Sequence, residues 1–162
     1  MIDLRKAPLD RAYLESVDLI EVSLERAWLF SAHLSDVDLG GANLRQTELQ
    51  NANLIDAKLT DADLRESNLG SADLRCANLS GSNLHGAWLA FADLRDAQVT
   101  IEHLTKVRSL QGALMPDGSD YDGRFGLDGD LENARALGVD TGDLKAMAHY
   151  YSQRASQRKR RS

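Results

Sequence analysis

The amino-acid sequence predicts an all-β solenoid followed by a small α-helical appendage. Three observations lead to this fold class. Leucine occupies every fifth position from Leu4 to Leu94, nineteen times in succession, and Val99 continues the register. A small or β-branched residue, most often alanine, lies two positions before each of these twenty residues. Beyond Val99 the five-residue period stops and helix-like patterns begin.

A five-residue period fits neither an α-helix nor a continuous strand. Five residues rotate an α-helix by about 500°, so the leucines would point to every side of it. An odd spacing on a strand would alternate between its two faces. Within one unit, however, the small residue and the leucine share a face, the polar residue between them points outward, and the remaining two residues are free to turn a corner. The chain is therefore expected to coil around its own leucines, which places in the core Leu24, Leu44, Leu54, Leu64, Leu74 and Leu84.

The repeat resembles the pentapeptide repeat family, whose consensus is A(D/N)LXX. Matching units are Ala52-Asn53-Leu54, Ala62-Asp63-Leu64, Ala72-Asp73-Leu74 and Ala77-Asn78-Leu79. The resemblance covers residues 2–101 and implies a right-handed quadrilateral β-helix, four units to a coil and about five coils long. We call residues 1–101 the tower. The segment QGALMPDG resembles the C-terminal continuation of many bacterial, often cyanobacterial, proteins of this family.

A C-terminal cap is predicted over residues 102–153. Thr100 can cap a short helix at about residues 101–108, and SLQGALM then looks like one more repeat-like turn that ends at Pro116. The acidic segment 117–130 is predicted to be a loop. Two helices are expected after it, a brief one near 131–137 that stops at Gly138 and a longer one from about 141 to 156.

The last predicted helix carries one apolar stripe. Its residues are Leu144, Met147, Ala148, Tyr151 and Ala155. This stripe is expected to pack on the tower, or alternatively to form a dimer or partner contact. The first coil has an open strand edge that Pro8 and nearby charges partly protect, so a homodimer through the N-terminal coil is also left open.

Composition and charge exclude several classes of protein. No apolar run is long enough for a membrane span and no secretory leader is visible, so we expect a cytoplasmic protein. The tower holds 16 acidic and nine basic residues, a net charge of −7, which argues against direct nucleic-acid binding by it. The four histidines and the lone Cys76 have no metal-ligand or catalytic spacing. We therefore expect no enzyme activity, no metal site and no cofactor.

Surface aromatic residues and a basic tail are the candidate partner-binding features. Trp28 and Trp88 fall in one column of residues twenty apart, with Phe30 and Phe91 beside its ends. These rings are either partner anchors or isolated surface residues. Residues 154–162, which include Arg158 and Arg160, are predicted to form a solvated, disordered tail; the alternatives are binding to nucleic acid, acidic lipid or an acidic protein.

The leading functional hypothesis is a noncatalytic scaffold that displays rigid β-helix faces to a protein partner. A solenoid filled with leucine offers regular outer surfaces for such contacts. The family resemblance implies an alternative, a DNA mimic that binds a type II topoisomerase such as DNA gyrase. The net negative charge of the tower agrees with that alternative, whereas Arg45, Arg65, Arg75 and Arg95 interrupt a continuous negative face.

Overall fold

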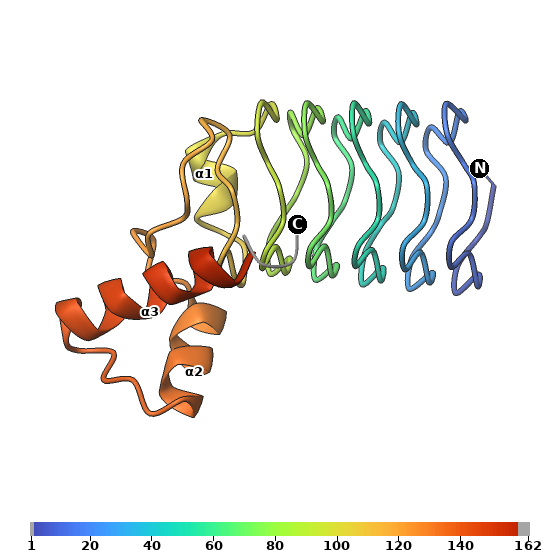
Figure 1. The fold of residues 1–162 in the computed structure, drawn as a ribbon. Helices are drawn as coiled ribbons and strands as arrows, with labels where there is room; N and C mark the ends of the chain where they lie inside the picture. The colour runs from blue at the N-terminus through green and yellow to red at the C-terminus, as the bar shows by residue number, and fades with distance from the viewer. Residues whose placement is uncertain (1, 159–162) are drawn as a thin grey trace.

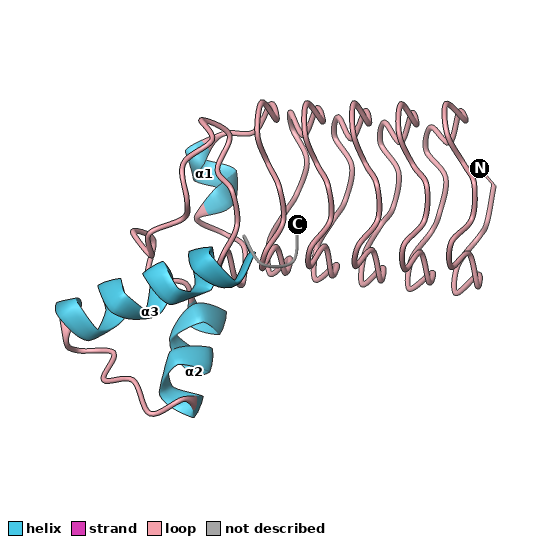
Figure 2. Cartoon of the chain, viewed as in Figure 1, coloured by secondary structure: helices cyan, strands magenta, loops and turns pink. Residues whose placement is uncertain are grey.

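The protein is a β-helical solenoid with a helical appendage at its C-terminal end (Figure 1). The structure is a computed structural model and describes residues 2–158. Each residue at the middle of an extended segment forms a parallel bridge with the residue twenty positions later, from Asp3 and Ser23 to Asn78 and Gln98. One coil therefore takes twenty residues, which is four repeat units. Because every bridge is isolated, Figure 2 draws the described coils as loops rather than as strands.

Backbone hydrogen bonds join the coils in both directions. Leu54 N donates to Asp73 O at 2.8 Å, and Asp73 N donates to Ala52 O at 3.0 Å. The turn within each unit is closed by a bond such as Ala57 N to Leu54 O, at 3.1 Å. The second central residue of these turns has a positive φ, for example +58° at Ser71 and +60° at Cys76. The regular turn explains how a two-residue corner repeats through the tower.

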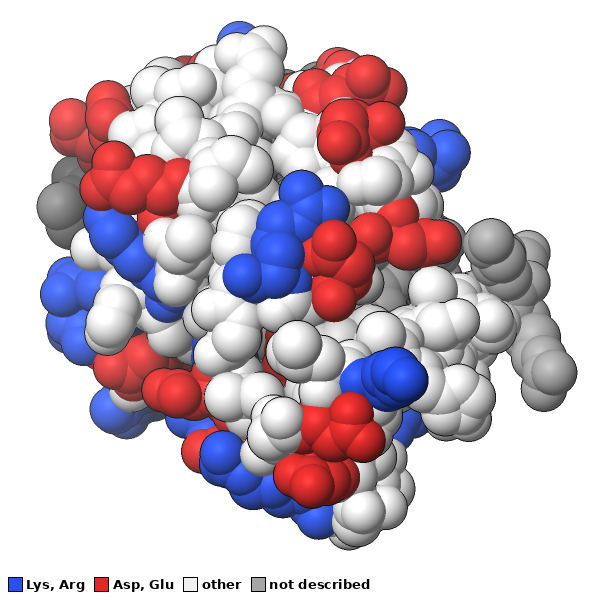
Figure 3. All heavy atoms as spheres, turned by 90° about the vertical axis from the view of Figure 1, so that its left-hand side faces the viewer, with Lys and Arg blue, Asp and Glu red and all other residues white. Residues whose placement is uncertain are grey.

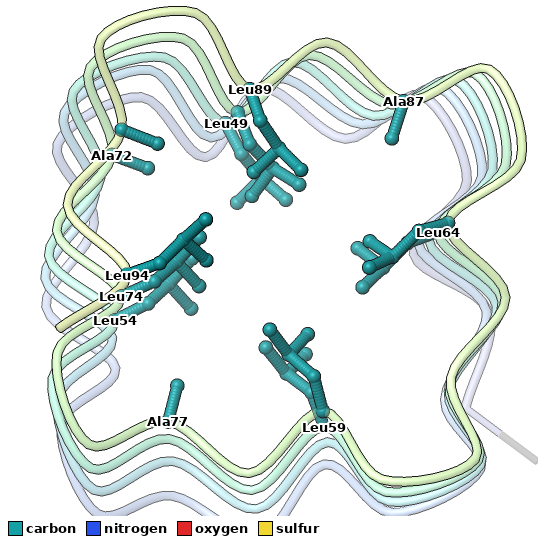
Figure 4. Packing of buried hydrophobic residues seen from close by; sticks show 14 of the residues in the cluster. Leu49, Leu54, Leu59, Leu64, Ala72, Leu74, Ala77, Ala87, Leu89 and Leu94 are labelled. Atoms are coloured by element: carbon teal, nitrogen blue, oxygen red, sulfur yellow. The ribbon is translucent and has the colours of Figure 1, made fainter. Parts of the chain in front are cut away.

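The leucines point inward and fill the tower (Figure 4). Every one from Leu24 to Leu94 is at most 2% exposed. This group contains all six of the leucines that the sequence places in the core. Leu4, Leu9 and Leu14 in the first coil are only partly buried, because that coil has a neighbour on one side alone.

Three inward positions carry hydroxyl residues in place of alanine, and each hydroxyl is hydrogen-bonded. Thr47 Oγ1 donates to Leu44 O at 2.6 Å. Ser67 and Ser82 repeat this contact, each with the carbonyl oxygen three residues earlier, at 2.7 Å. The small-residue positions can therefore accept a hydroxyl without leaving a buried polar group unsatisfied.

The short helix α1 (Ile101–Leu104) interrupts the solenoid without ending it. Thr100 caps α1 as predicted, with its side chain accepting from His103 N, but the helix is shorter than expected. The chain then returns to the tower for one more partial coil. Trp88 bridges to Ser109 and Asp93 bridges to Leu114, so the register is now 21 residues because of the inserted turn. The predicted repeat-like turn at Leu110 is buried in the same core.

The appendage consists of a loop and two helices, α2 (Asp128–Ala136) and α3 (Leu144–Arg158), at the end of the tower (Figure 1). Tyr121 and Tyr151 pack edge to face at 5.5 Å between ring centroids. None of the three helices in the described part of the chain has the length and apolarity needed to cross a bilayer.

The predicted stripe of the last helix was partly wrong. Met147, Tyr151 and Ala155 are buried, but Leu144 is 87% exposed and Ala148 is exposed as well. Tyr150 is buried instead and packs against Tyr151. The buried stripe is thus shifted around the helix, because two adjacent tyrosine rings fill the space against the loop and the last coil.

The boundary of the basic tail was also predicted too early. Residues 154–158 are helical, Ala155 is buried, and Arg154 lies over the Tyr150 ring at 5.0 Å. These contacts continue α3 to Arg158. Arg160 and the rest of the predicted tail lie outside the described residues.

Candidate partner-binding groove

The predicted column of surface aromatics exists on one face of the tower. Bridges join Trp28 to Glu48, Glu48 to Asn68 and Asn68 to Trp88. Trp28 is 58% exposed and Phe30 is 43% exposed, whereas Trp88 and Phe91 are half-buried. The two ends of the column therefore have different surroundings.

A groove of about 470 Å³ extends along this face between the two ends. Its lining residues come from successive coils and from α2. They are Phe30, Gln50, Asn51, Asn68, Gly70, Ser71, Trp88, Ala90, Phe91, Gln111 and Asn133. None of the eleven is charged, although charged residues make up 27% of the chain. The hollow forms because Gly70, Ser71 and Ala90 are small and lie between the larger rings.

On the floor of the groove, side chains rather than backbone amides are available to contact a bound molecule. Ser71 N donates to Ala90 O at 2.9 Å, and Asn51 N donates to Gly70 O at 3.0 Å, so these amides are occupied by the solenoid itself. Gln50 Nε2 donates to Glu48 Oε2 at 2.8 Å, and Gln50 Oε1 is buried without a hydrogen-bond partner. A bound molecule would therefore be recognised by carboxamides, a hydroxyl and aromatic rings.

The appendage covers the C-terminal end of the groove. A Cβ atom at Gly129 of α2 would lie 3.1 Å from Trp88 Cζ3 and 2.7 Å from Arg108 O. A Cβ atom at Gly112 would lie 2.5 Å from Phe91 Cδ1. Both aromatic residues thus pack against glycines that follow the tower. Of the four predicted aromatic anchors, three line the groove, and Trp28 lies outside the lining.

A buried polar cluster, which we call the clasp, holds α2 and α3 to the last coil. Asp130 Oδ1 accepts from Ser109 Oγ at 2.5 Å and from Gln111 N at 3.2 Å. Gln111 Oε1 accepts from the Tyr150 hydroxyl and from Asn133 Nδ2, the latter at 3.4 Å. The Tyr151 side chain also lies beside Asp130, and we define the clasp as Ser109, Gln111, Asp130, Tyr150 and Tyr151. Sequence reasoning missed the clasp and assigned Asp130 to an acidic loop.

Burial dominates the acid–base behaviour of the clasp. Asp130 is 0% exposed, and this burial raises its pKa to about 6 despite the hydrogen bonds from Ser109 and the backbone. Burial likewise raises the pKa of the Tyr151 hydroxyl. Asp130 Oδ2 and the Tyr151 hydroxyl are both buried without a partner in hydrogen-bonding geometry. Their proximity still has an effect, because Tyr151 lowers the pKa of Asp130 and Asp130 raises the pKa of Tyr151.

The twenty-residue coil stacks Arg45 with Arg65 and Arg75 with Arg95, an arrangement that could bind an anion, but three of these four arginines are paired with acids. The guanidinium groups of Arg65, Arg75 and Arg95 lie 2.5 to 2.7 Å from the aspartates two residues before them. The hydrogen bond from Arg65 lowers the pKa of Asp63. Acidic and basic side chains are also interspersed over the appendage end of the molecule (Figure 3). These pairs leave little uncompensated charge for an anion-binding stripe.

The remaining chemical candidates occupy separate surface positions. His33 stacks on Tyr13 with ring centroids 4.4 Å apart, and Cys76 is an exposed free thiol. Among residues 2–158, no group of three or more His, Cys, Asp or Glu side chains could hold a metal ion. The groove combines the aromatic rings of the tower with a hollow, and two further hollows near the appendage are lined by Phe125 or by Tyr121 and Tyr151.

Comparison with known proteins identifies the repeat. The family model for pentapeptide repeats matches residues 32–70 and 62–98, with eight copies. No curated protein matches the sequence. Among solved structures, HetL of the cyanobacterium Nostoc sp. strain PCC 7120, a pentapeptide repeat protein involved in heterocyst differentiation regulation, is 33% identical with a TM-score of 0.54. The match covers 72% of this chain and 63% of HetL, so the chain spans less than two thirds of that relative.

Two further structures have the same repeat. A pentapeptide repeat protein of the Arabidopsis thaliana thylakoid lumen is 26% identical, with a TM-score of 0.54 and coverage of 73% of this chain and 79% of that one. The Nostoc PCC 7120 protein alr5209 is 45% identical over 52% of this chain and 67% of its own, with a TM-score of 0.49. With its uninterrupted five-residue leucine repeat and twenty-residue coils, the chain belongs to the pentapeptide repeat family.

Proposed function

We propose that the protein is a noncatalytic scaffold for protein–protein interaction and that a partner protein binds in the groove. The observation that carries this proposal is the uncharged lining of the groove, with Phe30 at one end and Trp88 and Phe91 at the other. Aromatic residues at the edges of a hollow are typical anchors of protein interfaces. We also propose that the β-helix is right-handed with about five coils, and that the protein is bacterial and cytoplasmic.

The physical basis of binding is a preformed surface. The leucine core and the paired backbone fix the positions of the lining residues, so the scaffold side loses little conformational entropy on binding. The partner segment is expected to carry few charges, because no lining residue supplies a counter-charge and Glu48, bonded to Gln50, is the one carboxylate in the column beside the groove. Since the backbone amides of the floor are already paired, the partner is expected to contact side chains rather than to add a strand.

Site-specific photo-crosslinking in the native cell tests this proposal. A benzoylphenylalanine residue at position 71 lies in the groove, and the same residue at position 61 occupies another exposed turn with a similar φ, +58° and +56° respectively. We expect one identifiable protein adduct from position 71 that disappears when Trp88→Ala is added, and none from position 61. Equal adducts from both positions, or an adduct that survives Trp88→Ala, would contradict the proposal.

A DNA mimic that modulates a type II topoisomerase is the second candidate. It is favoured by the net charge of −7 on the tower and by the pairing of Arg65, Arg75 and Arg95 with aspartates. Dimerisation through α3 or the N-terminal coil would double the length of the rod. No change in the supercoiling activity of DNA gyrase at saturating protein would eliminate this candidate.

A further inference from the structure

The clasp contains a carboxyl group in an unusual environment for an ionised acid. Asp130 is 0% exposed, its Oδ1 accepts hydrogen bonds, and its Oδ2 is buried beside the Tyr151 hydroxyl, which lies outside hydrogen-bonding geometry. Among the described residues, no Lys or Arg forms an ion pair with it. A buried carboxylate without a cation is costly, so this site favours the protonated acid.

The groups that face Asp130 come from three directions. The last coil contributes Ser109 and the backbone amides of Leu110 and Gln111. Tyr121 of the loop and the two tyrosines of α3 are the titratable neighbours, and the pKa of each tyrosine is raised, mainly by burial. The charged groups around the clasp are Glu132 of α2, whose carboxylate pairs with Arg108 at 2.5 Å at the exposed rim, and Arg154 of α3, which lies over the Tyr150 ring at 5.0 Å.

The clasp and the groove share a wall. Gln111 and Asn133 line the groove, and Gln111 receives hydrogen bonds from Tyr150 and Asn133 while its backbone amide donates to Asp130. Gly129, next to Asp130 in the chain, packs on the Trp88 ring, and its amide donates to Arg108 O at 3.0 Å. Any loosening of α2 would therefore remove Asn133 and uncover Trp88.

We propose that protonation of Asp130 tightens the docking of α2 on the last coil and thereby completes the C-terminal wall of the groove. The inference rests on the proposed function only in its final step, in which partner binding in the groove becomes stronger at acidic pH. The docking step stands on the clasp itself and needs no partner.

The direction and range of the effect follow from the two states of Asp130. Its pKa is about 6 when the clasp is formed and about 3.8 when α2 is released, so the docked state binds the proton more tightly. The extra docking is fully present below pH 4 and is lost as the pH rises through 6. A shift of about two pKa units corresponds to a roughly 100-fold weaker docking equilibrium at neutral pH than at pH 4.

Trp88 fluorescence reports docking directly. In a Trp28→Phe background Trp88 is the single tryptophan, and α2 covers part of its ring. We expect its emission to shift to longer wavelength between pH 4 and pH 7, with a midpoint below 6. Asp130→Asn should remove this transition, because an amide stays neutral and can still accept from Ser109. Asp128→Asn, an exposed position on the same helix, should retain it.

A second variant keeps the inference testable if α2 does not dock in the Asp130→Asn variant. Ser109→Ala removes a hydrogen bond that favours the ionised carboxylate, so it should move the midpoint to higher pH. A pH-independent emission in the Trp28→Phe protein, or an unchanged transition in Asp130→Asn, would overturn the docking step. That result would leave the proposed groove function untouched.

The final step has its own readout. The crosslink yield from position 71 should fall between pH 4 and pH 7 in the wild-type background and stay constant with Asp130→Asn. A docking transition without any change in crosslink yield would overturn the coupling to the groove. A complete absence of crosslinks at both pH values would instead contradict the proposed function.

Discussion

Replacement of Leu54 by aspartate is expected to abolish cooperative folding. Leu54 is 0% exposed in the middle of the tower and packs within the layers of leucine side chains shown in Figure 4. The change removes about 1.5–3 kcal/mol of side-chain burial. It also leaves a buried carboxylate without a cation, which costs several kcal/mol more. The sum approaches the whole stability of a typical domain, about 5–15 kcal/mol.

The matched control is the neighbouring outward residue. Asn53→Asp introduces the same carboxylate one position away, and its Oδ1 can still accept from Ile55 N, a bond of 3.2 Å in the protein. Thermal unfolding followed by circular dichroism should show a transition for Asn53→Asp and none for Leu54→Asp. Ala57→Phe, which overfills a 0% exposed inward position, should behave like Leu54→Asp. A wild-type transition in either core variant would contradict the inward arrangement.

The second large effect is expected from Gly123→Ala, which should release α3. The φ angle of Gly123 is +86°, and a Cβ atom there would lie 2.0 Å from Tyr151 Cε2. The Tyr151 ring would have to leave its place against Tyr121, at a cost of about 1–3 kcal/mol for overpacking in addition to the backbone strain. Hydrogen exchange should show lower protection of the α3 amides, while the amides of the tower keep theirs.

Gly118→Ala separates the steric effect from the backbone effect. Gly118 has a similar φ of +80°, and nothing lies within 4 Å of an added Cβ atom. It should therefore cost about 1–2 kcal/mol through the left-handed backbone alone and leave α3 protected. Equal loss of α3 protection in both variants would show that the Tyr151 contact does not hold the helix.

The tower could be predicted from sequence because its determinants are local and repeated. Each leucine and the small residue two positions before it define one inward edge, and nineteen repeats leave no choice of register. The cap of α1 at Thr100 is equally local. The appendage was harder to predict, because its burial depends on contacts between distant segments. Tyr150 is buried where Ala148 was expected, since its hydroxyl reaches Gln111, 39 residues away.

The groove could be predicted only in part. Phe30, Trp88 and Phe91 were identified as candidate anchors because the twenty-residue period places them on one face. The hollow between them depends on Gly70 and on the side chain of Asn133, which α2 brings from 63 residues further along the chain. Asp130 gave no signal of burial, because the acidic segment around it is typical of an exposed loop. One clue was available for the covered end of the groove. After α1 the register changes from 20 to 21 residues, which places Gly112 beside Phe91.

A positive charge introduced into the groove tests directly whether the partner protein binds there. Ser71→Arg introduces a cation into the uncharged lining, and Cys76→Arg introduces the same cation at the next exposed turn, which has nearly the same φ. Affinity for the partner captured at position 71 is measured by titration calorimetry with both variants. We expect at least a tenfold loss of affinity for Ser71→Arg, about 1.4 kcal/mol, and wild-type affinity for Cys76→Arg. Wild-type affinity in Ser71→Arg would contradict binding in the groove.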